Sequence, residues 1–206
     1  MITRILLLTA FVGHIICWVS DLLLIYAPGG RFRFDCMDNN EKMSKVFEGM
    51  PLKRPLASML LGLLALMMSF GGYLGLYEWI KQFSVPCAAV IIVSAVLFFI
   101  PVAAHHVFCG TVEWFYIRLG RTEEAREAVL DFFKKTSVTM YVCYLGLLVS
   151  AIALFIAIVT GNTSLPQWSC LFNVIPLYIA FALFKAPGAG NLAGGAMFLG
   201  LFLLMR

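Results

Sequence analysis

Apolar runs about as long as a bilayer is thick are the feature of this sequence that most constrains its fold. Six segments are apolar enough, or nearly so, to cross a membrane as helices: residues 4–26, 55–77, 85–117, 137–160, 168–185 and 189–205. A spanning helix needs ~20 predominantly apolar residues. Of the 206 residues, 62% are hydrophobic and 13% are charged, whereas ~25% of the residues of a soluble domain are charged. We therefore predict an all-α, polytopic membrane protein, in which residues 1–206 form a single domain of six transmembrane helices.

The third segment, 85–117, is longer than a bilayer requires and contains Pro101. We expect this helix to tilt or kink and then to continue beyond the hydrocarbon region. The sixth segment, 189–205, is short and rich in glycine, so it is the weakest of the six spans.

With six spans, the basic residues divide unequally between the two sides of the membrane. One side receives the loops 27–54 and 118–136 and the turn 185–188. That side carries twelve of the 15 lysines and arginines: Arg31, Arg33, Lys42, Lys45, Lys53, Arg54, Arg118, Arg121, Arg126, Lys134, Lys135 and Lys185. The other side carries Arg4, Lys81 and Arg206. Under the positive-inside rule, this predicts a multi-pass protein of the plasma or inner membrane with both termini outside and both long loops in the cytoplasm.

The first cytoplasmic loop contains the stretch "NNEKMSKVFEGM", whose apolar residues recur at helical spacing. We expect a short amphipathic helix at the inner membrane interface, flanked by Arg31 and Arg33 as ligands for lipid phosphates. The alternative is a plain connector whose charges only follow the positive-inside rule. The apolar residues of this stretch are Met43, Val46, Phe47 and Met50.

The second loop, "LGRTEEAREAVLDFFKK", predicts a helix stop at Gly120 and a new helix that begins with Thr122 as its N-cap. Glu123 and Glu124 then lie where the helix dipole favours negative charge. We expect this helix to run into the fourth span, so that the third and fourth helices form an antiparallel hairpin extended into the cytoplasm.

Ionisable residues inside the apolar runs are the candidates for a functional site, because each costs several kcal/mol in a bilayer unless it has a partner. His14 and Asp21 are seven residues apart in the first span, and so are His106 and Glu113 in the third. Residues seven apart on a helix differ by ~20° in azimuth and ~10.5 Å in height. Since the two helices run in the same direction, we predict that these stripes face each other in the cytoplasmic half, histidine near histidine and acid near acid.

These four residues are our candidates for catalysis. A histidine and a carboxylate in an apolar pocket suit acid–base chemistry, and the same four could hold a divalent metal that activates water. The alternatives are that a histidine only hydrogen-bonds a neighbouring carbonyl and that Glu113 only reaches the interface.

A second set of residues is assigned to ligand binding. Gly110 leaves the face between His106 and Glu113 open, while His105 is turned ~100° away from His106. Asn191 and Lys185 lie at the inner ends of the last two spans. The predicted ligand-binding residues are His105, Gly110, Asn191, Lys185, Arg31 and Arg33.

Three functions remain open at this point. The first is a protein that binds, and in an enzymatic version modifies, a lipid-like or amphipathic small molecule. The second is a small transporter or channel-like subunit, for which the glycine-rich "KAPGAGNLAGG" would line a path. The third is a sensor or structural partner of another membrane protein, or a homo-oligomer joined through glycine-rich helices. Nucleic acid is not an expected partner, because the basic residues are sorted by membrane side.

The six cysteines, at 17, 36, 87, 109, 143 and 170, show no CxxC and no zinc-type spacing. Most lie in apolar segments, where a thiol behaves as a small hydrophobic group. Cys87 and Cys170 fall at the outer ends of spans, and a disulfide between them is left open.

Overall fold

The structure, a computed structural model, describes residues 1–205. Arg206, one of the three basic residues expected on the outer side, lies outside the described residues. The chain is 81% helical, and the predicted all-α class is confirmed. The two strands that occur in residues 1–205 are two residues long each and pair as an antiparallel turn, with Tyr26 opposite Arg31.

In chain order the elements alternate between long helices and short connecting elements. They are α1 (Ile2–Ile25), β1 (Tyr26–Ala27), β2 (Gly30–Arg31), the 3₁₀ helix η1 (Phe34–Asp38), α2 (Asn40–Val46), α3 (Lys53–Ile80), α4 (Val85–Arg118), α5 (Glu123–Thr136), α6 (Val138–Val159), the 3₁₀ helix η2 (Gln167–Phe172), α7 (Val174–Leu183) and α8 (Ala189–Leu204).

Within residues 1–205, four helices are long and apolar enough to cross a membrane: α1, α3, α4 and the α5–α6 pair, which together cover Glu123–Val159. The bounds of α1, α3, α4 and α6 agree with the first four predicted spans to within a few residues, because the apolar runs end where these helices end. Ser84, for example, accepts a hydrogen bond from the backbone of Cys87 at 3.4 Å and begins α4. The helix then continues through Pro101 to Arg118.

The last two predicted spans differ from the prediction in length. The α7 helix has 10 residues and α8 has 16, which correspond to ~15 and ~24 Å, against the ~30 Å of a hydrocarbon core. The segment 168–185 falls short because its first part is the 3₁₀ helix η2, after which Asn173 caps α7 by accepting from the backbone of Ile175 at 3.1 Å.

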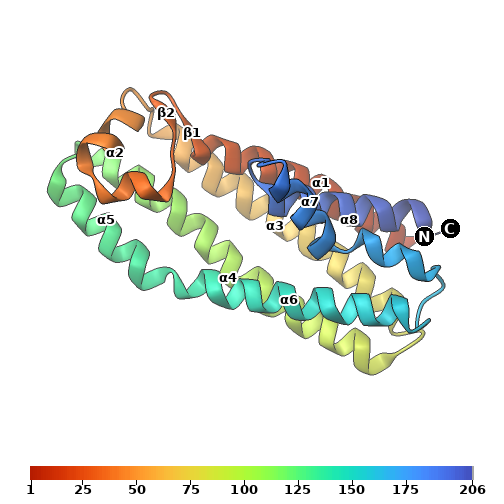
Figure 1. The fold of residues 1–206 in the computed structure, drawn as a ribbon. Helices are drawn as coiled ribbons and strands as arrows, with labels where there is room; N and C mark the ends of the chain where they lie inside the picture. The colour runs from red at the N-terminus through yellow and green to blue at the C-terminus, as the bar shows by residue number, and fades with distance from the viewer. Residues whose placement is uncertain (206) are drawn as a thin grey trace.

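The turn between α7 and α8 lies beside the middle part of α1, well short of β1 (Figure 1). Trp18 donates its indole N–H to the carbonyl of Pro187 at 2.8 Å. Since Trp18 is seven residues before the end of α1, this turn stops ~10 Å short of that end. We had expected the turn level with the two long loops.

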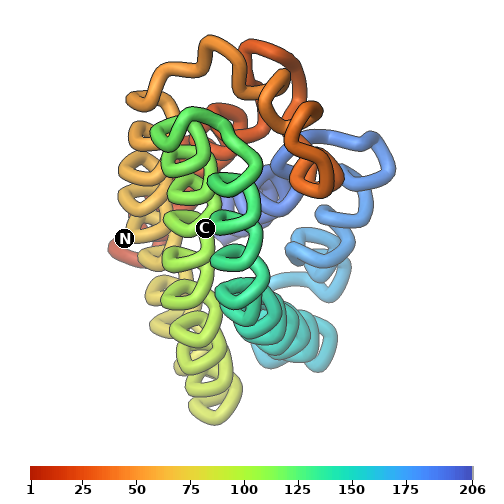
Figure 2. The backbone as a smooth tube through the Cα atoms, turned by 90° about the vertical axis from the view of Figure 1, so that its left-hand side faces the viewer, coloured from red at the N-terminus to blue at the C-terminus, as the bar shows by residue number. Residues whose placement is uncertain are grey.

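The helices pack side by side in the order α6, α4, α3, α1, α8, α7, and α6 meets α7 through few residues. Viewed along the bundle, the α4–α5 hairpin stands between α3 on one side and α7–α8 on the other (Figure 2). The N-terminus and the end of α8 lie together (Figure 1), with the Arg4 guanidinium 4.7 Å from the centre of the Phe202 ring.

Residues 26–54 and 118–136 gather at the opposite end of the bundle (Figure 1), and we call them the basic cap. They contain every basic residue assigned above to the cytoplasmic side except Lys185. The cap has its own apolar core, which joins η1 and α2 to α4 and α5: Met37, Met43, Phe47, Met50, Val112, Tyr116, Ala125 and Val129.

This core corrects one prediction. A short helix does form in 40–46, yet its apolar residues Met43 and Phe47 are fully buried against the α4–α5 hairpin. They therefore do not face a membrane interface, because the hairpin projects far enough beyond the bundle to cover them.

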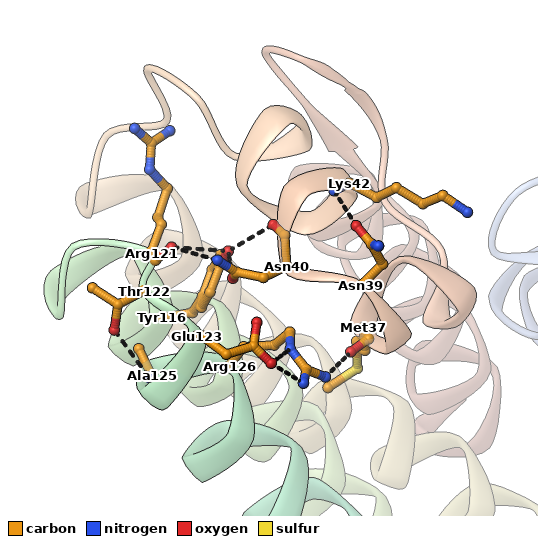
Figure 3. A network of polar contacts seen from close by, with 10 residues as sticks. All are labelled: Met37, Asn39, Asn40, Lys42, Tyr116, Arg121, Thr122, Glu123, Ala125 and Arg126. Carbon is orange, nitrogen blue, oxygen red and sulfur yellow. Dashed lines mark hydrogen bonds and ion pairs between the residues drawn. The ribbon is translucent and has the colours of Figure 1, made fainter.

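Polar contacts hold the cap together (Figure 3). The Tyr116 hydroxyl donates to the side-chain oxygen of Asn40 at 2.6 Å, and the Asn40 amide donates to the carbonyl of Arg121 at 3.2 Å. Arg126 donates to the carbonyl of Met37 at 2.8 Å and also contacts Glu123.

The predicted stop and cap between α4 and α5 are confirmed. Gly120 has a φ of +82°, and the Thr122 hydroxyl accepts from the backbone of Ala125 at 3.2 Å. The helices α5 and α6, which we call the α5–α6 arm, are separated only by the single residue Ser137.

Candidate functional site

A carboxylate of α1 and an imidazole of α4 meet inside the bundle. The Asp21 Oδ1 and His106 Nδ1 atoms are 3.5 Å apart, and the side chains are 25% and 8% exposed. The predicted pairing of histidine with histidine and acid with acid is therefore wrong. Asp21 lies four residues before the end of α1 and His106 twelve before the end of α4, so α4 projects ~12 Å farther. That offset is close to the seven-residue spacing of each stripe and sets the acid of one helix against the histidine of the other.

The hydrogen bonds of His106 fix the position of one of its protons. Its Nε2 lies 3.1 Å from the carbonyl oxygen of Ser58, and a carbonyl can only accept, so Nε2 carries a hydrogen. The Ser20 hydroxyl is also 3.1 Å from Nε2, while the Ser58 hydroxyl donates to the Ser20 carbonyl at 2.8 Å. All of these groups are buried, and together they join α1, α3 and α4.

The other ring nitrogen of His106, Nδ1, faces the Asp21 carboxyl. Two lone pairs in this position would repel each other, so one proton belongs between the two groups. The pair is then either an imidazolium with a carboxylate or two neutral groups, and in both cases it holds one exchangeable proton. Such a pair can give a proton to a bound molecule or accept one from it.

Asn191 extends the network to α8. Its amide nitrogen donates to Asp21 Oδ2 at 2.8 Å, which turns its oxygen toward His14 Nδ1 at 3.1 Å. Since an amide oxygen accepts, His14 carries its hydrogen on Nδ1. A continuous polar chain therefore runs from His14 through Asn191, Asp21 and His106 to Ser58.

Two glycines make room for the two histidine rings. A Cβ on Gly194 of α8 would lie 2.5 Å from Cε1 of His14, and a Cβ on Gly62 of α3 would lie 2.8 Å from Cε1 of His106 and closer still to its Nε2. His14 also stacks on Phe198 at 5.6 Å, and its Nε2 is buried without a hydrogen-bond partner in residues 1–205.

Ser20, Ser58, Gly62 and Gly194 were not among the predicted site residues. Gly62 and Gly194 carried a signal only as small residues suited to close helix packing. Serines that bond within helices are common, and they gave no signal from one sequence.

Glu113 lies in the same helix as His106 but not in this network. Its side chain is 2% exposed, and its Oε2 has no hydrogen-bond partner among the described residues. Gly110, which we expected to leave space for a ligand, packs on α3, where a Cβ would lie 3.0 Å from the sulfur of Met59 and 3.3 Å from the carbonyl of Pro55.

The other predicted ligand-binding residues lie elsewhere. His105 faces α6, with Nδ1 3.2 Å from the Thr139 hydroxyl. Lys185 is exposed in the α7–α8 turn and Arg31 on β2, while Arg33 pairs with Asp35 at 3.3 Å on the surface of the cap.

The predicted metal-ligand set does not assemble. Within residues 1–205, no three His, Cys, Asp or Glu side chains are grouped so that they could hold an ion together. Asp21 and His106 meet, but His14 reaches Asp21 only through Asn191. All six cysteines, Cys87 and Cys170 among them, are free thiols.

Two features bear on whether the polar network can be reached from outside the bundle. The Asp21 side chain is a quarter exposed although it lies within a membrane-length helix. The α7–α8 turn lies at the same level, and non-helical backbone at membrane depth is tolerated only where it is buried in protein or lines a water-filled cavity.

An apolar groove runs along the seam between α6 and α7. Its volume is about 330 Å³, and it is lined by Ile152, Phe155, Cys170, Leu171, Asn173, Ile175, Pro176 and Ile179. Ile179, the last α7 residue of this lining, lies four residues before the end of α7.

Comparison with known proteins adds the family. No curated protein and no solved structure is significantly similar to the chain. One family model matches residues 1–206. The chain therefore belongs to that family, which is described as a family of unknown function (DUF6796).

Proposed function

We propose that this membrane protein binds an amphipathic, lipid-like molecule whose polar head contacts Asp21 and whose apolar part lies in the α6–α7 groove. The observation that carries the proposal is the partial exposure of a carboxylate paired with His106 inside an apolar bundle. An ionisable pair at membrane depth costs several kcal/mol. An ionisable residue inside a membrane is by default a functional-site hypothesis, and the exposed part of the Asp21 carboxylate is open to contact by a bound molecule.

The contacts of Asp21 indicate the chemistry of the head group. A carboxylate has about four acceptor positions, of which Asn191 and His106 occupy two. The remaining positions suit a head that donates hydrogen bonds, such as an ammonium, amide or hydroxyl group. The groove beside α7 is almost entirely apolar, which suits an acyl or similar chain, and its volume is within the ~300–1,000 Å³ of ligand sites.

Six membrane-embedded segments and a cytoplasmic basic cap complete this proposal. The basic residues of the cap support the orientation under the positive-inside rule. The short α7 and α8 helices then enter and leave from the outer face, and both termini lie outside. A reporter enzyme that is active only outside the membrane should be active when fused after residue 206 and inactive when inserted at Glu127. The reverse pattern would contradict the orientation.

A second candidate is a proton-coupled transporter, favoured by the continuous polar chain from His14 to Ser58. A carrier of this kind needs a group that gains and loses a proton at membrane depth, and the Asp21–His106 pair is such a group. Proton flux into liposomes that contain the protein, lost in Asp21→Asn, would favour this candidate over a binding protein.

The test of the binding proposal compares two aspartates. Wild-type protein, Asp21→Asn and the surface control Asp35→Asn are purified from the same membranes, and bound molecules are extracted and measured by mass spectrometry. We expect one amphipathic species at near-stoichiometric amounts in wild type and Asp35→Asn, and a loss of at least tenfold in Asp21→Asn. Equal amounts in all three proteins would refute the proposal, provided that Asp21→Asn melts at the wild-type temperature.

A further inference from the structure

A second cluster of reactive side chains lies on α4, away from the Asp21 network. Cys109 Sγ is 3.6 Å from His105 Nε2, and His105 Nδ1 is 3.2 Å from the Thr139 hydroxyl of α6. His105 is turned ~100° from His106, so this cluster faces the α5–α6 arm while His106 faces α1 and α3.

The positions of the hydrogens in this cluster can be deduced from the hydrogen bond that Thr139 donates. The Thr139 hydroxyl donates its single hydrogen to the carbonyl of Thr136 at 2.7 Å. Its oxygen must therefore accept from His105, which places the histidine hydrogen on Nδ1 and leaves a lone pair on Nε2. That lone pair is directed at the thiol of Cys109.

The order thiol, imidazole and orienting oxygen is the arrangement that activates a cysteine nucleophile. A base accepts the thiol proton, and a third group holds the base in the right tautomer. Cys109 and His105 are one helical turn apart on the same face of α4, and Thr139 is held near the start of α6 by its own bond, so none of the three needs to move.

The surroundings of the thiol are apolar toward the α5–α6 arm. Phe133 lies 5.9 Å from the His105 ring, and Phe108 packs on Phe132 at 5.3 Å. Cys109 is partly exposed, nine residues before the end of α4, or ~13 Å below it. Lys134 and Lys135 are exposed just before the α5–α6 junction.

We propose that Cys109 is an S-acylation site that accepts a fatty acyl group from a long-chain acyl thioester, with His105 as the base and Thr139 as a positioning residue. The acyl chain of such a donor would lie in the leaflet next to the basic cap, and its anionic head would lie on the side of the cap. The inference does not depend on ligand binding at Asp21, since it uses none of those residues.

The reaction balances without any redox partner. His105 Nε2 takes the proton of the Cys109 thiol, and the thiolate attacks the carbonyl carbon of the donor. A new carbon–sulfur bond forms to Cys109 as the bond to the donor's sulfur breaks. The departing thiolate takes the proton back from His105, which leaves a thioester on Cys109 and a free thiol in solution.

The test uses full-length protein in nanodiscs with alkynyl palmitoyl-coenzyme A. We expect labelling that hydroxylamine removes, present in wild type and in the control Cys36→Ser and absent in Cys109→Ser. Removal of a general base slows transfer by ~10²–10⁴-fold, so His105→Gln should label that much more slowly at pH 7 and regain rate at high pH, where the thiol ionises without help. Labelling of Cys109→Ser at the wild-type rate would overturn the proposal, as would a His105→Gln rate equal to wild type at every pH.

A variant pair on α6 guards against loss of folding in His105→Gln. Thr139→Ser retains the orienting oxygen and should label at nearly the wild-type rate, whereas Thr139→Val lacks it and should be at least tenfold slower with the same pH trend. Equal rates for these two variants would show that Thr139 does not position His105.

Discussion

Gly62→Ala is the substitution whose effect follows most directly from the geometry of the polar network. The added methyl group would overlap the His106 ring, which packs directly on Gly62 of α3. The neighbour that must give way is a ring held on one side by the Ser58 carbonyl and the Ser20 hydroxyl and on the other by Asp21. The ring cannot shift without losing at least one of these contacts.

The magnitude is the sum of three effects. Overpacking a filled site costs ~1–3 kcal/mol, and leaving a buried polar partner unsatisfied costs ~1–3 kcal/mol. Alanine in place of glycine within a helix returns ~1 kcal/mol. We therefore expect Gly62→Ala to lower the free energy of unfolding by about 1–5 kcal/mol.

Gly71 of the same helix provides the matched control. A Cβ there would meet only Leu6 Cδ2, at an ordinary 3.6 Å. Gly71→Ala should therefore leave stability unchanged or raise it by up to ~1 kcal/mol. Unfolding by SDS in mixed micelles, followed by the fluorescence of the four tryptophans, measures both variants.

A double variant decides whether the His106 ring is the cause. With His106→Ala as background the overlap is gone, so Gly62→Ala should then cost less than ~1 kcal/mol. The difference from its cost in the wild-type background is the coupling expected for residues in contact. If Gly62→Ala costs the same with and without the ring, or costs no more than Gly71→Ala, the packing of His106 described above is incorrect.

Three further predictions address other parts of the chain. Gly194→Ala should destabilise the protein by ~1–3 kcal/mol because the added methyl group meets the His14 ring. Gly195→Ala should be nearly neutral, since its Cβ would lie 3.5 Å from the Cβ of His14. Equal changes in melting temperature for the two variants would contradict the placement of the His14 ring. Phe47→Ala should lower the free energy of unfolding by ~3–5 kcal/mol, because Phe47 is 0% exposed in the cap core. Hydrogen exchange should become faster in α2 and α5 and stay unchanged in α1, and a uniform change in exchange would argue against a separate cap core. Thr122→Ala removes an N-cap and should cost ~1 kcal/mol, read from amide exchange in the first turn of α5, and unaltered exchange there would argue against the cap.

The long helices could be predicted from the sequence because each has an apolar run as long as a bilayer is thick. Hydropathy reports only the average over a window, however. It could not separate the 3₁₀ helix η2 from the ten residues of α7, because a window over residues 168–185 averages the two segments. It also could not show that the α7–α8 turn stops beside Trp18, since that depth is set by contacts with α1 that are distant in sequence.

The residues of the polar network could be predicted from the sequence, but the way in which they pair could not. Strongly polar residues are rare inside apolar helices, and this rarity identified the ionisable Asp21, His106 and His14 and the amide Asn191. Their pairing depends on how far α4 projects past α1, and the spacing within each helix does not determine that offset. Glu113 belongs to the same stripe as His106 by spacing, yet the same offset leaves it beyond the end of the network.

The proposed function requires that an amphipathic molecule reaches Asp21 from the α6–α7 side. An experimental structure of the protein purified from its own membranes, without added ligand, tests this most directly. We predict density whose polar end lies within hydrogen-bond distance of the Asp21 carboxylate and whose apolar part follows the groove lined by Ile175 and Ile179. An Asp21 carboxylate closed off by side chains of the protein itself, with no density in that groove, would contradict the proposed function.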